Sequence, residues 1–338
     1  MSHPPGQPEV SVIVPARNEE AGLAACLASL VGQSGPPCEI IVVDDHSTDK
    51  TRAIAEGFPV TVISAAPLPE GWSGKCNAVW SGANVAKGKW LLFTDADTVH
   101  SDASIATGLR EAEAKGAAML SFSPQQIVHG FAERALMPVI FAELASTFRP
   151  GEVSDPHSPA AAANGQYLLV RRDAYDAVGG HAAVATAILE DVELARLLKR
   201  AGYRLQFRLS DVVRARMYRS FRAMWEGWTK NLALLFRRPL WLAGKRALEF
   251  LLILSATLAM LQAAFVRHRT LEALWFGAPA AIFIILLVRR IWRAHFDPLS
   301  SALALFGLPL FSLLLVNSYI SHRNGNVVWK GRVYPGKA

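Results

Sequence analysis

The sequence has little cysteine and no paired cysteine motif. Its 338 residues include three cysteines, Cys26, Cys38 and Cys76, whose positions fit neither a CxxC pair nor a zinc-ligand spacing. They are expected to be small buried residues in a reducing compartment. The N-terminal stretch MSHPPGQPEVSV shows no basic segment followed by a long apolar one, so no cleavable secretory signal is expected. We therefore expect roughly the first 240 residues to stay in the cytosol.

A glycine-rich turn is missing where a dinucleotide enzyme would need one. The first predicted strand, residues 9–16, runs into PARNEE, which has no GxGxxG pattern. This absence argues against a fold that holds a bare pyrophosphate on the first strand–helix turn.

Acidic residues are scarce in one stretch. Between Arg196 and Arg246 there are 14 Lys and Arg against two acids, Asp211 and Glu226, a local charge of +12, whereas the whole chain carries +7. The remainder therefore carries about −5, and the basic stretch borders strongly apolar sequence. This distribution indicates contact with anionic lipid and a positive-inside topology, and it does not favour a nucleic-acid groove.

Three long apolar runs follow the basic stretch, at residues 248–266, 271–288 and 299–320. Each has about the length that crosses a bilayer core, roughly 20 residues. The prediction is a multi-pass protein of the inner cell membrane with a cytoplasmic catalytic domain. Three spans would place the tail outside the cell. If one run is re-entrant, the tail is cytosolic.

The first two hundred residues alternate strand and helix patterns. Strands are expected at 9–16, 38–45, 59–64 and 89–97, and helices at 19–33, 48–58 and 74–88. This alternation predicts an α/β domain with a mostly parallel sheet. Ligands of such sheets bind beyond the carboxyl ends of the strands.

Four carboxylates follow these strand ends: Asp44, Asp45, Asp95 and Asp97. Asp95 and Asp97 point the same way because side chains in an extended chain repeat every two residues. Their repulsion requires a divalent metal, a lysine or arginine, or a shared proton. A carboxylate can accept hydrogen bonds from ribose or base, and an Asp-x-Asp pair with Mg²⁺ or Mn²⁺ can hold a diphosphate. The expected ligand is a nucleotide diphosphate with a metal.

In this order, SVIVPARNEE, EIIVVDDHSTDKT, GKCNA, LLFTDADT and LEDVELARLLKRAGYR resemble the motifs of family 2 glycosyltransferases, enzymes of the GT-A fold that use nucleotide sugars. The resemblance covers about residues 10–215. It implies a nucleotide-sugar pocket, with a metal held by Asp97 together with Asp95. The residues implied for the pocket are Pro15, Arg17, Glu19, Asp45, Lys75 and Asp95. It also implies that Asp191, next to Glu190, is the catalytic base.

Further segments resemble a membrane-anchored branch that glycosylates lipid, carotenoid, hopanoid or polyprenyl acceptors. These are ANGQYLLVRRDAYDAVGGH at 163–181, which contains Gly165 and Gln166, and WKGRVY at 329–334. The chain departs from processive polysaccharide synthases of the family, because YRSFRAMWEGWTKN stands where they carry QxxRW. The resemblance thus favours inverting, non-processive transfer to a membrane lipid, with a UDP-sugar as the expected donor.

A basic amphipathic helix is expected between the two regions. Phe221, Trp225, Trp228, Leu232 and Leu235 recur at helical spacing among many cations, as in a helix lying in the membrane interface. Packing against the protein core is the alternative. Arg222, Trp225 and Trp228 are candidate acceptor-side residues.

Other readings stay open at this point. LLFTDADTV also fits the haloacid-dehalogenase phosphatase pattern, with Asp95 as nucleophile, but this leaves the first two strand-end motifs without roles. A non-catalytic membrane binding protein and a processive synthase are further alternatives. Asp44 and Asp49 could be local caps. His100 could complete a metal shell, although a lone histidine is more often structural.

The expected layout has five parts. They are a flexible tail at 1–8, a GT-A domain at 9–218, an interfacial helix region at 219–246, a membrane region at 247–320 and a C-terminal tail at 321–338.

Overall fold

The computed structural model describes residues 8–292 and 294–334, so most of the expected tail at 1–8, and residues 335–338 of the second tail, lie outside the described residues. The chain divides into two compact units. The first comprises the chain up to Ile127 together with Phe148–Met217. The second comprises Val128–Thr147 together with the chain from Tyr218 onward.

The first unit is an α/β domain. Its strands are β1 (Val10–Ala16), β2 (Cys38–Asp44), β3 (Thr61–Ser64), β4 (Trp90–Phe93), β5 (Thr98–His100), β6 (Met119–Gln126), β7 (Leu168–Arg171) and β8 (Leu205–Ala215). Its helices are α1 (Leu23–Val31), α2 (Thr51–Glu56), α3 (Gly74–Val85), α4 (Ser104–Ala114), α6 (Pro150–Ser154), α7 (Arg172–Ala177), the 3₁₀ turn η1 (Gly180–Val184) and α8 (Glu190–Arg200).

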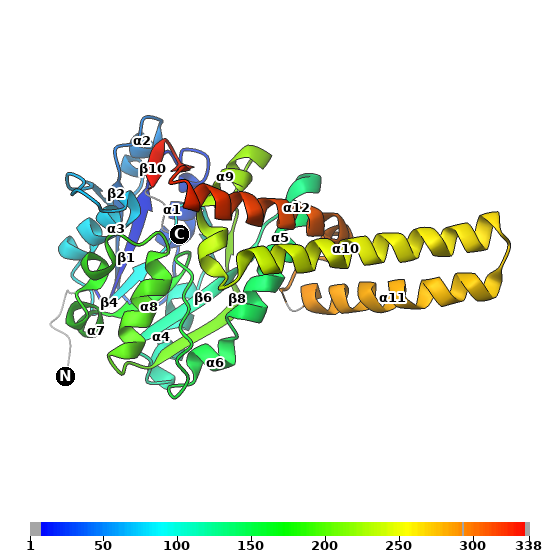
Figure 1. The fold of residues 1–338 in the computed structure, drawn as a ribbon. Helices are drawn as coiled ribbons and strands as arrows, with labels where there is room; N and C mark the ends of the chain where they lie inside the picture. The colour runs from blue at the N-terminus through cyan, green and yellow to red at the C-terminus, as the bar shows by residue number, and fades with distance from the viewer. Residues whose placement is uncertain (1–7, 293, 335–338) are drawn as a thin grey trace. The chain divides into compact units, whose positions relative to one another are not determined.

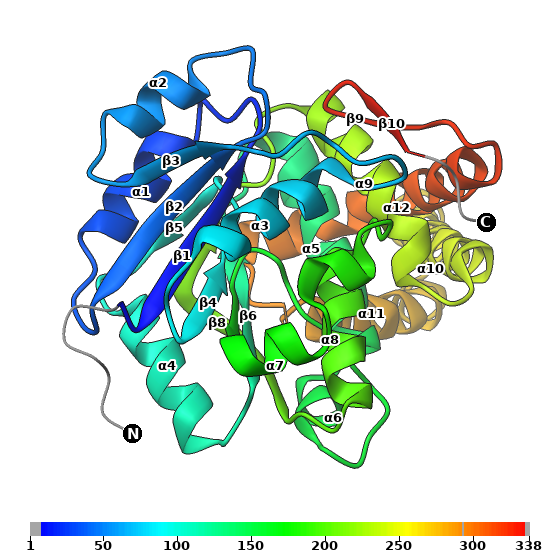
Figure 2. The same ribbon diagram turned by 90° about the vertical axis from the view of Figure 1, so that its left-hand side faces the viewer.

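The eight strands form one sheet in the order β3-β2-β1-β4-β7-β6-β8-β5. Its β3-β2-β1-β4 half is parallel, as the alternation of strands and helices predicted, with Val14 opposite Val42 and Val12 opposite Leu92. Strand β7 is antiparallel to both β4 and β6. Figure 2 shows the parallel strands β1, β2 and β3 side by side. The carboxyl ends of β1, β2 and β4 therefore meet at one edge.

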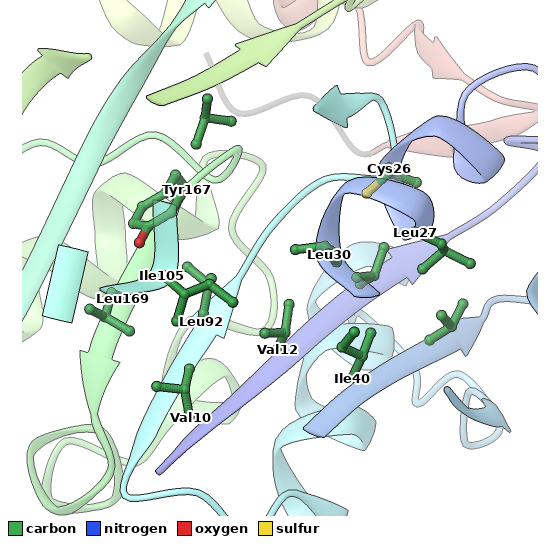
Figure 3. Packing of buried hydrophobic residues seen from close by; sticks show 14 of the residues in the cluster. Val10, Val12, Cys26, Leu27, Leu30, Ile40, Leu92, Ile105, Tyr167 and Leu169 are labelled. Carbon is green, nitrogen blue, oxygen red and sulfur yellow. The ribbon is translucent and has the colours of Figure 1, made fainter. Parts of the chain in front are cut away.

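The sheet is buried on both faces, which explains why its strands read as unbroken apolar runs. Val10 and Val12 of β1 pack with Leu27 and Leu30 of α1 on one face, together with Ile105 of α4 (Figure 3). The other face carries a second core built from Ile13, Ile41, Val79, Leu91 and Leu194. Alternate residues of each strand thus serve opposite cores.

The second unit is mainly helical. Its elements are α5 (Gly130–Thr147), α9 (Phe221–Leu235), α10 (Pro239–Leu261), the π-helical turn η2 (Gln262–Val266), α11 (Thr270–Trp292), α12 (Pro298–Arg323), β9 (Val327–Trp329) and β10 (Arg332–Tyr334). Helices α10 and α11 pack on each other as a long hairpin, coloured yellow to orange in Figure 1.

Three helical segments of this unit are long and apolar enough to cross a membrane: Pro239–Val266, Thr270–Trp292 and Pro298–Arg323. They differ in the share of their residues that the protein itself buries. Within the most apolar window, 11% is buried in each of the first two, and 44% in the third. Helix α12 packs along α5, α9 and α10.

Helix α9 begins at Phe221, where the Ser220 side chain accepts a hydrogen bond from the backbone N–H of Ala223. Its most buried side chains are Met224, Trp228 and Leu232. The outer residue Phe221, expected on the same face, is half exposed. The helix therefore buries only part of the apolar face that the sequence pattern indicated.

Candidate active site

The first two strand ends hold a pair of charged side chains. Arg17, just beyond β1, donates a hydrogen bond from Nη1 to the backbone carbonyl of Asp45 at 2.8 Å, and the same nitrogen lies 3.9 Å from Asp45 Oδ2. Asp45 is 4% exposed. Pro15 lies in β1 opposite Val43, and its side chain is half-buried. The edge of the sheet thus places a carboxylate and a guanidinium together.

The neighbouring acids shape the turns around this pair. Asp44 Oδ1 accepts the backbone N–H of Ser47 at 3.2 Å, and Asp49 Oδ1 accepts that of Thr51 at 2.9 Å. Both acids therefore act as local caps, the alternative weighed from the sequence. The Glu19 backbone N–H donates to Thr51 Oγ1 at 2.7 Å, which fixes the loop carrying Glu19 against this turn.

A lysine bridges two carboxylates from distant parts of the chain. Lys75 lies in the first turn of α3, whose N-terminus is capped by Ser73. Its Nζ lies 2.8 Å from Asp95 Oδ1, at the end of β4, and 2.9 Å from Glu190 Oε1, at the start of α8. The side chains of Lys75, Asp95 and Glu190 are 34%, 28% and 8% exposed. Asp95, the first acid of TDADT, thus has a lysine as a counter-charge.

Asp191 is the second acid at the start of α8. Its Oδ2 accepts the backbone N–H of Gly165 at 2.8 Å, and its Oδ1 accepts that of Val192 at 2.8 Å. Burial and the nearby charge of Glu190 raise the pKa of Asp191 to about 6, while Lys75 and the two N–H donors oppose the rise. A carboxylate with a pKa near 6 is ionised at neutral pH and basic enough to take a proton in a reaction.

Lys75 stays protonated in this cluster. Burial works to lower the pKa of Lys75, but the charges of Asp95 and Glu190, with that of Asp191, outweigh it and hold the pKa well above its usual range. The cluster therefore combines three carboxyl groups with one ammonium. That imbalance leaves negative charge that a further cation could neutralise.

The turn that carries Asp95 and Asp97 is held by its own backbone. Thr98 Oγ1 donates to the carbonyl of Asp95 at 2.8 Å, and the backbone N–H of Arg216 donates to the carbonyl of Asp97 at 3.1 Å. The side chains of both acids are half-buried. The main chain of both acids is thus fixed just beyond the end of β4.

His100 organises a buried polar network behind this turn. Its Nε2 lies 3.0 Å from Thr94 Oγ1 and 3.3 Å from Thr98 Oγ1, and its Nδ1 lies 3.0 Å from Ser104 Oγ. Burial lowers the pKa of His100 to about 3, so the ring is neutral. Both ring nitrogens are engaged by hydroxyl groups, which supports the structural reading of this histidine over a metal-ligand role.

The same network reaches the segment that contacts Asp191. Thr94 Oγ1 donates to the backbone carbonyl of Gln166 at 2.7 Å, and Gln126 Nε2 donates to Gln166 Oε1 at 3.1 Å. Gln166 is 3% exposed. Gly165 lies close to the Lys75 ammonium, because a Cβ added at this glycine would stand 3.0 Å from Lys75 Nζ.

The other three acceptor-side candidates belong to the second unit. Arg222 is 89% exposed and pairs with Glu226, and Trp225 packs with Phe221. Trp228 is buried, where its Nε1 lies 3.3 Å from Met137 Sδ. Its burial places Trp228 in the core of this unit, which is the packing role considered as the alternative for this helix.

The sequence did not reveal three contributors to the site. These are the Lys75–Glu190 pair, the Gly165 N–H and the His100 network. Ser73 offered a weak local signal, since a serine before a helix is a frequent cap. The Gly165 contact comes from the main chain and has no side-chain signature at all.

Comparison with known proteins identifies the family of the chain. A family model described as "Glycosyl transferase family 2" matches residues 11–179. A curated relative, 4,4'-diaponeurosporenoate glycosyltransferase of Staphylococcus aureus strain USA300, is 28% identical over 96% of this chain and 88% of its own length. A solved mannosyltransferase from Pyrobaculum calidifontis, in complex with GDP-Man and Mn²⁺, superposes with a TM-score of 0.53 at 17% identity, covering 94% of this chain and 87% of that one. This last likeness supports the GT-A-type fold.

Proposed function

Because the chain belongs to glycosyl transferase family 2, and is a glycosyltransferase, we propose that it moves a sugar from a nucleotide-diphosphate sugar to a membrane lipid, with inversion and without processive elongation. The observation that carries the proposal is the charged cluster at the carboxyl edge of the sheet, where Lys75 and Asp95 meet Glu190 and Asp191. This edge is where parallel α/β sheets bind their ligands.

The donor would bind along the edge from the first strand end to the third. Asp45, held by Arg17, would accept hydrogen bonds from the nucleoside, with Pro15 and Glu19 in the surrounding wall. Lys75 would face the diphosphate, because it is the ammonium nearest Asp95. The solved mannosyltransferase holds GDP-Man, and we propose UDP as the first nucleotide to test here.

The donor set at the DxD turn suits a divalent cation. Asp95 and Asp97 offer carboxylate oxygens, the ligands that Mg²⁺ and Mn²⁺ prefer. Among the described residues no group of three or more His, Cys, Asp or Glu side chains is placed to hold a metal. The two aspartates would therefore share the ion with the donor's phosphate oxygens, as magnesium sites often do. A bound ion would supply positive charge for the departing diphosphate.

The chain's own residues provide the acceptor half of the reaction. Asp191 would take the proton from an acceptor hydroxyl as that oxygen attacks the anomeric carbon. The Gly165 N–H fixes the orientation of Asp191 Oδ2, so that the carboxylate is aimed before the acceptor arrives. Glu190 would hold Lys75 in place beside it.

A lipid acceptor is proposed from the relative and from the apolar hairpin. The Staphylococcus aureus relative is named for a carotenoid acid, and the present chain carries helices that could span a membrane. A lipid with an apolar chain and one reactive hydroxyl or carboxyl group fits both facts. The carotenoid class is the first to be tested.

We further propose that only α10 and α11 span the membrane. Helix α12 packs against α5, α9, α10 and α11, and 44% of its most apolar window is buried, against 11% in the other two segments. Polar contacts tie its last turns to α9. Ser318 Oγ donates to the carbonyl of Thr229 at 2.6 Å, and His322 Nε2 lies 2.8 Å from the carbonyl of Lys230. These contacts hold the last two turns of α12 against the second half of α9. The tail would then share the side of α9, and the basic flank Arg237–Arg238 would make that side cytoplasmic.

The topology is tested with single cysteines in a chain whose three native cysteines are replaced by serine or alanine. His268→Cys lies between α10 and α11, and Asn326→Cys is exposed after α12. In intact cells a membrane-impermeant maleimide should label His268→Cys, and it should label Asn326→Cys only after permeabilisation. Labelling of Asn326→Cys in intact cells would show three spans, and protection of His268→Cys would show that the hairpin does not cross.

The activity is tested by separating three reaction classes. Purified protein is mixed with a UDP-sugar or GDP-sugar, Mn²⁺ and extracted membrane lipids. A transferase releases nucleoside diphosphate and yields a glycolipid seen by mass spectrometry, whereas a phosphatase releases inorganic phosphate and a mere binder releases neither. Full turnover in the presence of EDTA would show that the reaction needs no divalent metal. Asp97→Asn, folded but inactive, should behave as the EDTA-treated protein does.

A further inference from the structure

The position of Lys75 raises a question that the proposed reaction does not answer. Its ammonium forms ion pairs with Asp95 at 2.8 Å and Glu190 at 2.9 Å, although Asp95 is one of the two acids that would hold the metal. Three separate elements, α3, β4 and α8, bring these groups together. One carboxylate oxygen of Asp95 is therefore already paired with a cation that the chain itself supplies.

We infer that Lys75 is the resident cation of the donor site and competes with the divalent ion for Asp95. This inference rests on the proposed function, since it assumes that Asp95 helps to hold a metal. A dication placed beside Asp95 would face the Lys75 ammonium at close range, and two like charges repel strongly in a partly buried site. Metal alone therefore binds weakly.

The diphosphate of the donor removes the conflict. Its negative charge offers Lys75 a second partner, while Glu190 continues to hold the ammonium. Lysine suits this exchange because its ammonium has three donors on a flexible stem and can contact Glu190 and a phosphate oxygen at once. Gly165 leaves room for it, since a Cβ there would stand 3.0 Å from Lys75 Nζ. Metal and nucleotide should thus bind cooperatively, each raising the affinity for the other.

The experiment measures Mn²⁺ binding without turnover. Free Mn²⁺ is followed by electron paramagnetic resonance in titrations of the detergent-solubilised full chain, with no nucleotide, with UDP, and with GDP. The variant is Lys75→Met, and the matched control is Lys115→Met, an exposed lysine at the end of α4. Lys75→Arg keeps the positive charge. Lys75→Gln serves as a second neutral variant if Lys75→Met does not fold.

Wild-type protein should bind Mn²⁺ alone weakly and bind it roughly 5–150-fold more tightly with the matching nucleotide, the usual range of such coupling. Lys75→Met should bind Mn²⁺ alone at least about tenfold more tightly than wild type and lose most of the coupling. Lys115→Met and Lys75→Arg should resemble wild type.

Unchanged or weaker binding of Mn²⁺ alone by the neutral variants would overturn the inference. If the wild type still forms glycolipid with Mn²⁺ in that case, the proposed function stands and Lys75 has only a donor-side role. If the wild type binds no Mn²⁺ even with nucleotide, the metal part of the proposed function fails and the inference fails with it.

Discussion

Two groups of charged side chains, one in each unit, differ in their balance of acids and bases. The cluster in the first unit has three acids, Asp95, Glu190 and Asp191, for one lysine. The group in the second unit is balanced. Glu143 and Glu249 face Arg246 and Arg290, with Arg246 Nε 2.8 Å from Glu143 Oε1 and Arg290 Nη2 3.1 Å from Glu249 Oε1.

The difference fits the proposed roles of the two groups, reactive in the first unit and structural in the second. The four balanced charges pair with one another and connect α5, α10 and α11. An excess of acids cannot be satisfied in this way. Burial, together with the charge of Glu190, raises the pKa of one member, Asp191.

The largest expected effect comes from removing the proposed base. Asp191→Asn keeps the shape of the side chain but cannot take a proton, so transfer to a hydroxyl acceptor should fall roughly 10²–10⁴-fold. Donor binding, measured by calorimetry, should persist. Glu190→Gln is the matched control and should cost less. Near wild-type transfer by Asp191→Asn would mean that the base lies elsewhere, or that the acceptor is a carboxylate that needs no base.

Breaking the balanced group should affect folding and leave the chemistry intact. Arg246→Met leaves Glu143 and Glu249 with Arg290 alone, and removing one partner of a buried pair typically costs about 3–5 kcal/mol. The expected result is a lower yield and a lower melting temperature in detergent. The folded fraction should keep the wild-type rate of donor hydrolysis. A stable but inactive Arg246→Met protein would assign this group to catalysis instead.

The network behind the DxD turn should have an intermediate effect. His100→Leu removes the bonds to Thr94 and Thr98, which support the turn and the Gln166 carbonyl. Losing such a supporting contact commonly costs roughly 10–100-fold in metal affinity or activity. We expect a weaker Mn²⁺–nucleotide affinity with partial rescue by His100→Asn. If His100→Leu lowers only the stability of the protein and leaves its kinetic constants unchanged, His100 has only a structural role.

The smallest effect is a shift of the pH profile. Asp191 must be ionised to act as a base, so kcat/KM should fall as the pH drops below about 6. Lys75 opposes the rise in the pKa of Asp191, so Lys75→Gln should move this acid limb to higher pH. Because the pKa of Asp191 is raised in the folded state, the ionised form costs stability above pH 6. Asp191→Asn should therefore melt at a higher temperature at pH 7.5.

The sequence predicted the framework of the first unit because its signals are local. Buried strands end in acids at Asp45 and Asp95, and their neighbourhood follows from parallel pairing. The contact of Lys75 with Glu190 joins residues far apart in the chain, so no spacing rule could reveal it. For the three apolar runs, the sequence predicted the helices but not their surroundings. Composition shows that a helix is apolar, but it does not show how much of the helix the protein itself buries, which is 44% of the window in α12 and 11% in the other two segments.

Gly165 matters for anyone who wishes to change the acceptor of this enzyme by mutagenesis. Its contact with Asp191 is made by the main chain, whereas its missing side chain leaves the space beside Lys75. A side chain at this position would press on the lysine and contact the acid, so substitutions there should lower activity as well as alter specificity. Libraries that hold residue 165 fixed and vary its neighbours should retain far more active clones.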